Sequence, residues 1–486
     1  MRKNDIKAVL RFIGILLVAE GGLMALCLVP ALHFADGTAW RIAACSLATL
    51  LSGTALWVAF GRYRTIVDRR MAYLLVVLLW LTLTLFATLP LMVTGATTNF
   101  TQAFFEAMSG LTSAGGTIFA DVAALPASVL LWRSMMQWFG GFGIVLIVLA
   151  LTPRLGINKY ALYTAESSAA DNTGRTTLRA GVAVRRTLGV YLSLTAIFIA
   201  LLWLSGMQMW DAVNLTFTNI STGGFSVNGD SIASLTATQQ YILAAAMFLS
   251  GINFMLLYLF FTFRWRQIGH KLEQFGFYVV LCLLSVAFVV GGLHWHDGYG
   301  WSDALRLGTV QTVSALTTTG SVVADTTTWW TPVCFLLLML SVCGGMAGST
   351  SGGLKIMRVI ILLRNVRVTL NDRLHPSAVV PIRLNGVAVS THMRSNVMII
   401  FMVFGLTMLL GVMALILSGV DATQSIGASV GCLTGYGPGL GASGGFGSYA
   451  AFPPAAMWVC SVLMLLGRLE CMTVLVLLLP RFWRRN

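Results

Sequence analysis

A short segment in the C-terminal half of the chain places hydroxyl side chains and a glycine between two apolar stretches. Residues 314–321 read Ser-Ala-Leu-Thr-Thr-Thr-Gly-Ser, an amphipathic run at 301–316 leads into them, and a long apolar segment begins near Trp330. Backbone carbonyls and hydroxyls are neutral oxygen ligands that can replace the water around a monovalent cation. Glycine lets such a backbone turn without a Cβ clash. The segment therefore predicts a short helix, a cation-binding elbow and then a membrane span.

Three looser copies of this segment occur elsewhere in the chain. They are Phe-Glu-Ala-Met-Ser-Gly-Leu-Thr-Ser-Ala-Gly-Gly at 105–116, Phe-Thr-Asn-Ile-Ser-Thr-Gly-Gly-Phe at 217–225 and Gly-Cys-Leu-Thr-Gly-Tyr-Gly-Pro-Gly at 431–439. A single Thr-Gly pair between spans usually marks an ordinary turn. Four copies, each after a short helix and recurring roughly every 100 residues, instead predict a pore in which four elbows surround one ion.

The composition is that of a polytopic membrane protein. Of 486 residues, 57% are hydrophobic and 10% are charged, which is too apolar for a soluble chain of this size. The first apolar run, from about Val9, is followed by many others and predicts a span, not a cleaved signal peptide. The eight cysteines lack paired spacing, so neither a disulfide framework nor a zinc site is predicted. We find no nucleophile elbow, Walker loop or HExxH motif, so the sequence predicts no enzyme.

The net charge of +14 is distributed unevenly between alternating inter-span segments. Basic clusters occur at Arg62–Arg70, Arg175–Arg186, Arg264–Lys271, Arg364–Arg373 and Arg481–Arg485. By the positive-inside rule these segments are cytoplasmic. The segments between them carry most acids, Glu106 among them, with few basic residues such as Arg133 for balance. The basic residues lack interleaved aromatic residues, which excludes nucleic-acid binding.

The predicted fold is all-α, with two N-terminal spans followed by four span–pore-helix–span repeats around a central pore. We expect ten full spans, with 240–263 and 455–480 each forming one of them, and both termini in the cytoplasm. The predicted units are an N-terminal pair of helices (1–70), pore repeat 1 (71–151), a cytoplasmic linker (152–186), pore repeat 2 (187–263), pore repeat 3 with a broken second span (264–363), a second cytoplasmic linker (364–392) and pore repeat 4 (393–486).

The second span of the third repeat contains a run of glycines. These are Gly344, Gly345, Gly348, Gly352 and Gly353. Each costs about 1 kcal/mol in a helix interior, and the apolar segment 332–363 is longer than one crossing needs. We therefore expect an intramembrane loop beneath the elbows; the alternative is close packing of helices through small residues.

Arg468 lies within the last apolar segment. A charge at this depth is expected to face protein or water. Glu470 is two residues away on another helix face, so it is not an obvious partner for Arg468. The alternative role for Arg468 is a structural salt bridge to a neighbouring span.

The four elbows and the glycine-rich segment resemble those of the TrkH/KtrB family of bacterial potassium-translocating subunits, and the resemblance covers nearly the whole chain. It implies one filter glycine per repeat and potassium bound by the filter carbonyls that precede these glycines. The filter residues it implies are Ser113, Ala114 and Gly115; Thr222, Gly223 and Gly224; Thr318, Thr319 and Gly320; and Gly435, Tyr436 and Gly437. The chain departs from the family pattern at Ser113-Ala114 and at Thr434-Gly435-Tyr436.

The resemblance also implies a gate and partners. The glycines at 344, 345, 348, 352 and 353 and Arg468 would form the constriction, with Lys355 either contributing or marking the inner membrane surface. The chain would be a homodimer in the bacterial inner membrane, surrounded by lipid. It would bind no cofactor and would dock a cytosolic nucleotide-binding regulatory subunit similar to TrkA. Basic segments 152–186 and 364–394 are candidate docking surfaces.

Two alternatives stay open on the residues alone. A sodium- or proton-coupled secondary transporter of a small solute would need buried carboxylates and usually inverted repeats, but these repeats are parallel and only Glu20 and Glu470 are plausible intramembrane acids. The second alternative is a pore for sodium or another monovalent cation. A serine at the first filter glycine is associated with sodium transport among plant relatives, and Gly115 favours potassium.

Overall fold

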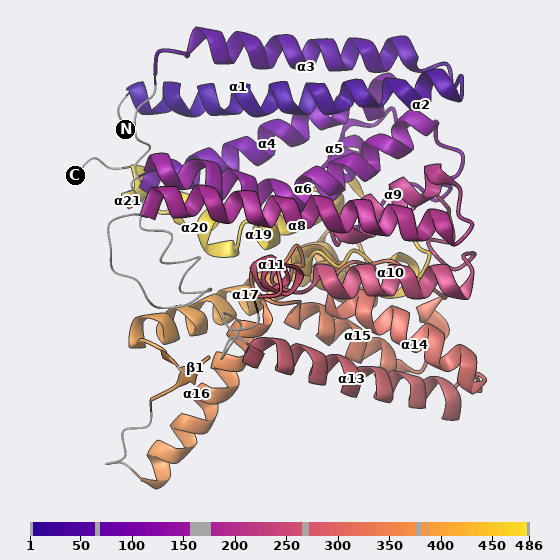
Figure 1. Ribbon diagram of the computed structural model, residues 1–486, viewed down its shortest axis with the longest axis vertical. Coiled ribbons are helices and arrows are strands. Elements are labelled where there is room, and N and C mark those ends of the chain that lie inside the picture. Colours follow the sequence, from indigo (N-terminus) through magenta and orange to yellow (C-terminus); the bar gives the residue numbers. More distant parts are fainter. Residues whose placement is uncertain are drawn as a thin grey trace.

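The computed structural model describes residues 3–63, 69–155, 176–264, 272–375, 381–385 and 387–483. Most helices lie side by side with their axes roughly aligned across the molecule (Figure 1). The strands among these residues form one antiparallel pair, β1 (Arg383–Leu384) and β2 (Val387–Ala388). The predicted all-α class is therefore confirmed.

The first helices form a separate layer at one edge of the molecule (Figure 1). α1 (Lys3–Leu26) continues into the short α2 (Leu28–His33) and packs along α3 (Ala39–Ala59). The two long helices approach closely at Gly14 and Gly53, where a Cβ on either glycine would lie within 2.8 Å of the other's carbonyl oxygen. Small residues permit such contacts between membrane helices.

Asp36 joins this layer to the rest of the molecule. Its carboxylate accepts hydrogen bonds from the backbone N–H and hydroxyl of Thr38 and from the backbone N–H of Ser128, which lies in the first turn of α6. Partial burial opposes the charged form, but these hydrogen bonds outweigh it and hold the pKa of Asp36 below its ordinary value. The carboxylate is therefore ionised at neutral pH and fixes the turn between α2 and α3.

Four short helices follow, each between two longer apolar segments. They are α5 (Phe100–Thr112), α9 (Met209–Ile220), α14 (Trp301–Leu316) and α18 (Ala422–Thr434). The segments that precede them are α4 (Arg69–Val93), α8 (Thr176–Leu204), α13 (Leu272–Trp295) and α17 (Thr391–Leu417). The segments that follow are α6 (Ala127–Leu155), α10 (Ala237–Ser250) with α11 (Phe254–Phe261), α15 (Thr331–Cys343) with α16 (Ile356–Leu374), and α19 (Pro454–Arg468) with α20 (Cys471–Leu478); α21 (Pro480–Trp483) ends the described chain.

Six described helices are long and apolar enough to cross a membrane. If each of two bent helix pairs also counts as one span, the described residues contain up to eight spans. The protein is thus a multi-pass membrane protein. α6 and the interrupted segment α15–α16 are outside those eight, so the count of ten spans and the four-repeat division stay predictions. The long helix α17 is mostly exposed along its length, with Met402, Leu409 and Leu417 among its uncovered side chains, as expected of a lipid-facing surface.

The helices in two of the expected spans are broken, which the sequence analysis did not predict. α10 and α11 meet at 108°, and α19 and α20 meet at 110°. At the first break the Asn253 side chain caps α11 by accepting hydrogen bonds from the backbone N–H groups of Met255 and Leu256. At the second, Glu470, the residue immediately before α20, has a φ of 55°. An asparagine cap and a left-handed residue both favour a new helix start over continuation.

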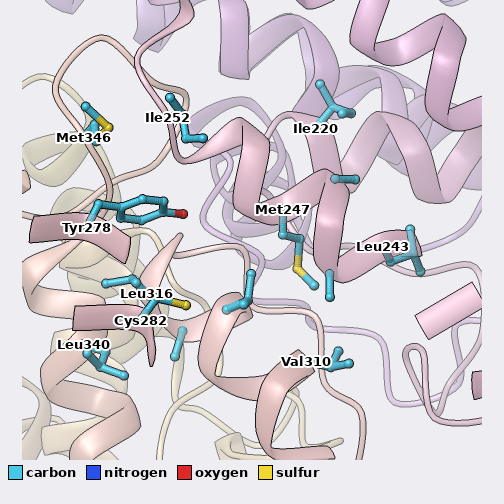
Figure 2. Packing of buried hydrophobic residues seen from close by; sticks show 14 of the residues in the cluster. Ile220, Leu243, Met247, Ile252, Tyr278, Cys282, Val310, Leu316, Leu340 and Met346 are labelled. Carbon is cyan, nitrogen blue, oxygen red and sulfur yellow. The ribbon is translucent and has the colours of Figure 1, made fainter. Parts of the chain in front are cut away.

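The interior holds two large apolar clusters. One is built on the N-terminal layer, α4, α5 and α19. The other joins α10, α13, α14 and α15 through side chains such as Met247, Tyr278 and Leu316 (Figure 2). Both clusters bury the short helices, so the segments that follow those helices are fixed in position by packing.

Candidate functional site

The four elbows, which follow the ends of the short helices, share one backbone pattern. Ser113, Thr222, Thr318 and Gly435 all adopt positive φ, between 54° and 74°. Two residues later Gly115, Gly224, Gly320 and Gly437 do the same, with φ between 74° and 86°. Left-handed backbone costs a non-glycine residue about 1–2 kcal/mol, and such strain concentrates at functional sites. The four predicted filter segments are therefore copies of one conformation.

These elbows meet one another in a closed ring. A Cβ built on Gly115 would collide with the carbonyl oxygen of Gly223, and one on Gly224 with that of Thr319. A Cβ on Gly320 would collide with the carbonyl oxygen of Tyr436, and one on Gly437 with that of Ala114. Each glycine thus lies against the next elbow in the order one, two, three, four and back to one. The structure brings all of the predicted filter glycines together.

The carbonyls in this ring are short of protein partners. Of the eight carbonyls predicted as ion ligands, only that of Gly223 accepts a hydrogen bond among the described residues, from the Gln137 side chain at 2.7 Å. Ala114 and Thr319 are fully buried and Tyr436 is 5% exposed. Buried carbonyls without a protein partner are costly unless water or a cation takes that place. The ring can therefore present several neutral oxygens to a cation.

A half-open pocket lies on one side of the ring. Gly115, Gly224, Gly320 and Gly437 all line it, together with the segments that leave the elbows. One chamber thus touches all four elbows, as an entrance to a shared passage must.

Side chains behind the ring were missed by the sequence analysis. Gln137 of α6 holds the second elbow, because its amide donates to the carbonyl of Gly223 and accepts from the N–H of Phe225. Gln311 of α14 accepts from the N–H of Val323 and donates to the hydroxyl of Tyr436. Tyr449 donates its hydroxyl to the carbonyl of Gly437. Only their polarity inside apolar stretches could have signalled these roles.

The sequence analysis counted Glu106 and Arg133 among the charges of the outer segments and did not predict that they pair with each other. Glu106 lies within α5, Arg133 within α6, and they form an ion pair with Nε and Oε1 2.8 Å apart. Their side chains are 0% and 1% exposed. The acid at 106 is therefore an interior group beside the first elbow.

The glycine-rich segment is a loop, as expected. α15 ends at Cys343 and α16 begins at Ile356. Gly344, Gly348 and Gly353 have positive φ. A Cβ on Gly345 would collide with the Ser351 side chain, and one on Gly352 with the Thr434 carbonyl oxygen. No continuous helix could pass here, which excludes simple helix packing as the reason for the glycines.

This loop docks against the inner ends of the elbows. The N–H of Gly352 donates to the hydroxyl of Thr318 at 2.6 Å, and that of Gly353 donates to the carbonyl of Thr434 at 2.9 Å. The loop also exchanges backbone hydrogen bonds with the break between α10 and α11, through Met346 to Gly251 and Phe254 to Gly348. It therefore contacts parts of three of the four helical units.

Arg468 connects the loop to the remaining unit. Its guanidinium donates to the carbonyl of Thr350 at 3.2 Å and to those of Gly140 and Gly141 on α6 at 2.7 and 3.0 Å. It lies at the C-terminal end of α19, at the break, and not within an unbroken span. Its predicted proximity to the glycine-rich loop is confirmed.

The other charged residues from the sequence analysis have separate places. Glu470 pairs with Arg358 at 2.7 Å, not with Arg468, and its side chain is 46% exposed. Lys355 donates to the carbonyl of Ser351 within the loop. Glu20 is buried in α1, and its carboxylate oxygens have no hydrogen-bond partner among the described residues.

Comparison with known proteins places this arrangement in a family. Residues 39–485 match the model of the TrkH family, described as cation transport proteins. The chain belongs to the TrkH family. A relative from Halomonas elongata, Trk system potassium uptake protein TrkH, is 33% identical, and the match covers 99% of this chain and 100% of that protein.

Other TrkH-family proteins agree with this assignment. The protein of the same name from Escherichia coli strain K12 is 31% identical over 98% of this chain and 99% of its own length. The crystal structure of the potassium transporter TrkH from Vibrio parahaemolyticus covers 99% of this chain and 100% of that chain, with a TM-score of 0.89 and 30% identity. Since the family consists of cation transport proteins, this chain is a transport protein and not an enzyme.

The substitution Gly320→Ala tests the ring. The new Cβ would meet the Tyr436 carbonyl, and alanine would be strained at a φ of 80°. We expect cation flux into proteoliposomes to fall roughly tenfold or more, since left-handed strain alone costs about 1–2 kcal/mol. The matched control is Gly229→Ala, because Gly229 lines the same cavity with open space at its Cβ position. Wild-type flux in Gly320→Ala would contradict the ring geometry.

Proposed function

We propose that this chain takes up potassium through a channel-like pore whose selectivity filter is the ring of elbow carbonyls. The potassium ligands are the carbonyls of Ser113 and Ala114, Thr222 and Gly223, Thr318 and Thr319, and Gly435 and Tyr436. The observation that carries the proposal is the ring itself, in which four glycines lie against four neighbouring carbonyls around one cavity. Such rings select cations by replacing their hydration water.

The choice of potassium is supported by relatives. Proteins 31–33% identical over nearly the whole chain are named potassium uptake proteins. Neutral carbonyl oxygens suit a weakly hydrated monovalent cation, and the elbows bring no carboxylate into the ring. A glycine at position 115 keeps the first elbow in the same backbone conformation as the other three.

The glycine-rich loop and Arg468 form the gate of this pore. The loop is buried directly beneath Thr318 and Thr434, and Arg468 ties it to α6. Loop and guanidinium together touch all four units, and none of their residues is among those that line the entrance cavity. Opening then requires these hydrogen bonds to be exchanged for others, which an intramembrane loop of glycines permits.

The proposed division keeps 1–70 as a separate helix pair and 152–186 and 364–392 as cytoplasmic linkers, with the ends of α6, α8 and α16 extending into these linkers. The beginning of α1 and the helix α21 lie on the same side of the molecule (Figure 1), which supports termini that share the cytoplasmic face of the inner membrane. Residues 156–175 of the first linker lie outside the described residues.

The working form is a homodimer that docks a cytosolic, nucleotide-binding, TrkA-like regulatory subunit. Relatives named as parts of a Trk system support a multi-component assembly. The basic segment at 364–394 is a candidate docking surface; its residues 364–375, 381–385 and 387–394 are among the described residues. Lipid covers exposed apolar faces such as that of α17.

The function is tested by growth of a bacterium that lacks its own potassium uptake systems. We expect this chain, expressed with its regulatory subunit, to restore growth at low potassium, and sodium supplementation to have no such effect. A chain with Gly320→Ala is the negative control. Membrane-inserted wild-type protein that restores no growth, or potassium uptake that requires a co-transported sodium ion or proton, would contradict the proposal.

The gate is tested by Arg468→Ala. Removal of the guanidinium deletes the hydrogen bonds to Thr350, Gly140 and Gly141, each charge-assisted and worth about 1.5–3 kcal/mol. We expect radioactive rubidium influx without the regulatory subunit to rise severalfold. Arg41→Ala is the control, because Arg41 donates to the Thr94 carbonyl in the N-terminal region. Reduced influx in Arg468→Ala would show that the arginine supports conduction and does not restrain it.

A further inference from the structure

The ion pair of Glu106 and Arg133 lies behind the first two elbows and has no place in the gate or among the carbonyl ligands. Both side chains are almost completely buried. Removing one partner of a buried pair leaves an uncompensated charge, which is far more costly than an ordinary surface substitution. We therefore expect this pair to have a role that uncharged side chains packed at the same position would not perform.

Every polar group of the pair is used to hold an elbow. The Glu106 carboxylate accepts from the N–H of Ile118 at 2.9 Å and from the hydroxyl of Thr117 at 3.0 and 3.1 Å. Both residues belong to the segment that leaves the first elbow. The carboxylate on α5 thus fixes the exit of the first elbow through two successive residues.

The arginine extends the same connection to the second elbow. Its Nη1 donates to the carbonyl of Ser226 at 3.1 Å, and its Nη2 donates to the hydroxyl of Thr117 at 3.1 Å. The guanidinium also lies 4.2 Å from the centre of the Phe225 ring. One rigid, planar cation therefore spans the exits of two elbows, a geometry that the flexible ammonium of lysine does not provide.

The remaining junctions between elbows are held by neutral groups. The second and third are joined by the Ser321 hydroxyl donating to Asn219. The third and fourth are joined by Gln311 and the Tyr436 hydroxyl. The fourth and first are joined by the N–H of Tyr449 donating to the carbonyl of Thr117. Among the described residues, the junction between the first and second elbows is the only one of the four that contains an ion pair.

We infer that Glu106 and Arg133 are positioning residues that fix the spacing between the first and second elbows and thereby set the ion selectivity of the ring. The inference depends on the proposed filter. A carbonyl ring discriminates between cations by the size of its opening and by the field of its dipoles. Loosening one junction lets the carbonyls of Ala114 and Gly223 close around a smaller ion. Sodium should then gain relative to potassium.

The test is the sodium-to-potassium permeability ratio, measured from reversal potentials in planar bilayers with purified protein. This ratio does not depend on the amount of protein inserted. We expect Glu106→Gln and Arg133→Gln each to raise it by about tenfold, within the usual range of coupling between parts of one protein. Asp303→Asn is the matched control, because it breaks the exposed Asp303–Arg306 pair on α14 and should leave the ratio unchanged.

Milder variants keep the test decisive if a buried charge prevents folding. Arg133→Lys retains the charge but loses the fork that reaches Ser226, and Thr117→Val removes the hydroxyl that both members bind. We expect each to raise the ratio less than the glutamine variants do. Potassium-selective wild-type currents with an unchanged ratio in these folded variants would overturn the inference while leaving the pore intact. Wild-type protein without potassium current would instead refute the proposed function.

Discussion

The structure depends on how backbone groups that leave helices inside a membrane find partners. An irregular backbone at this depth is tolerated only where protein buries it or a wet cavity borders it. At the elbows most of the inward carbonyls find no donor in the described part of the chain, and the proposed partner is a cation with its water. The glycine-rich loop and the broken helices instead satisfy one another through the bonds that link Gly251 with Met346 and Gly348 with Phe254. In the proposed mechanism, the first kind of irregular backbone lines the passage for the ion and the second closes it.

The two regions are mechanically connected. The Thr318 hydroxyl, one residue from a ring carbonyl, accepts the N–H of Gly352 in the loop. Thr434, immediately before the fourth elbow, accepts the N–H of Gly353. Movement of the loop must therefore break contacts with the elbows themselves. Gln137, Gln311 and Tyr449, behind the ring, hold the elbows by hydrogen bonds that do not involve the loop.

The sequence allowed the elbows, the four short helices and the glycine-rich loop to be predicted, because glycine and hydroxyl residues interrupt apolar runs there. It did not reveal the breaks at Asn253 and Glu470. At the first, the only local signal is the capping Asn253, and at the second the two charged residues Arg468 and Glu470 lie in a run that is otherwise apolar. The pair of Glu106 and Arg133 was also missed, because its members belong to different helices and nothing in the sequence shows that they meet. Tyr436 was a departure from the family pattern. In the structure its hydroxyl anchors the fourth elbow to α14, a contact that depends on the tertiary fold.

The central claim is that carbonyls from four distant parts of the chain surround a single ion. Diffraction from crystals grown with thallium, recorded at its absorption edge, tests this most directly. The account predicts anomalous peaks along one axis, enclosed by the carbonyl oxygens of Ala114, Gly223, Thr319 and Tyr436. Thallium bound elsewhere, with no peak inside that ring, would contradict it.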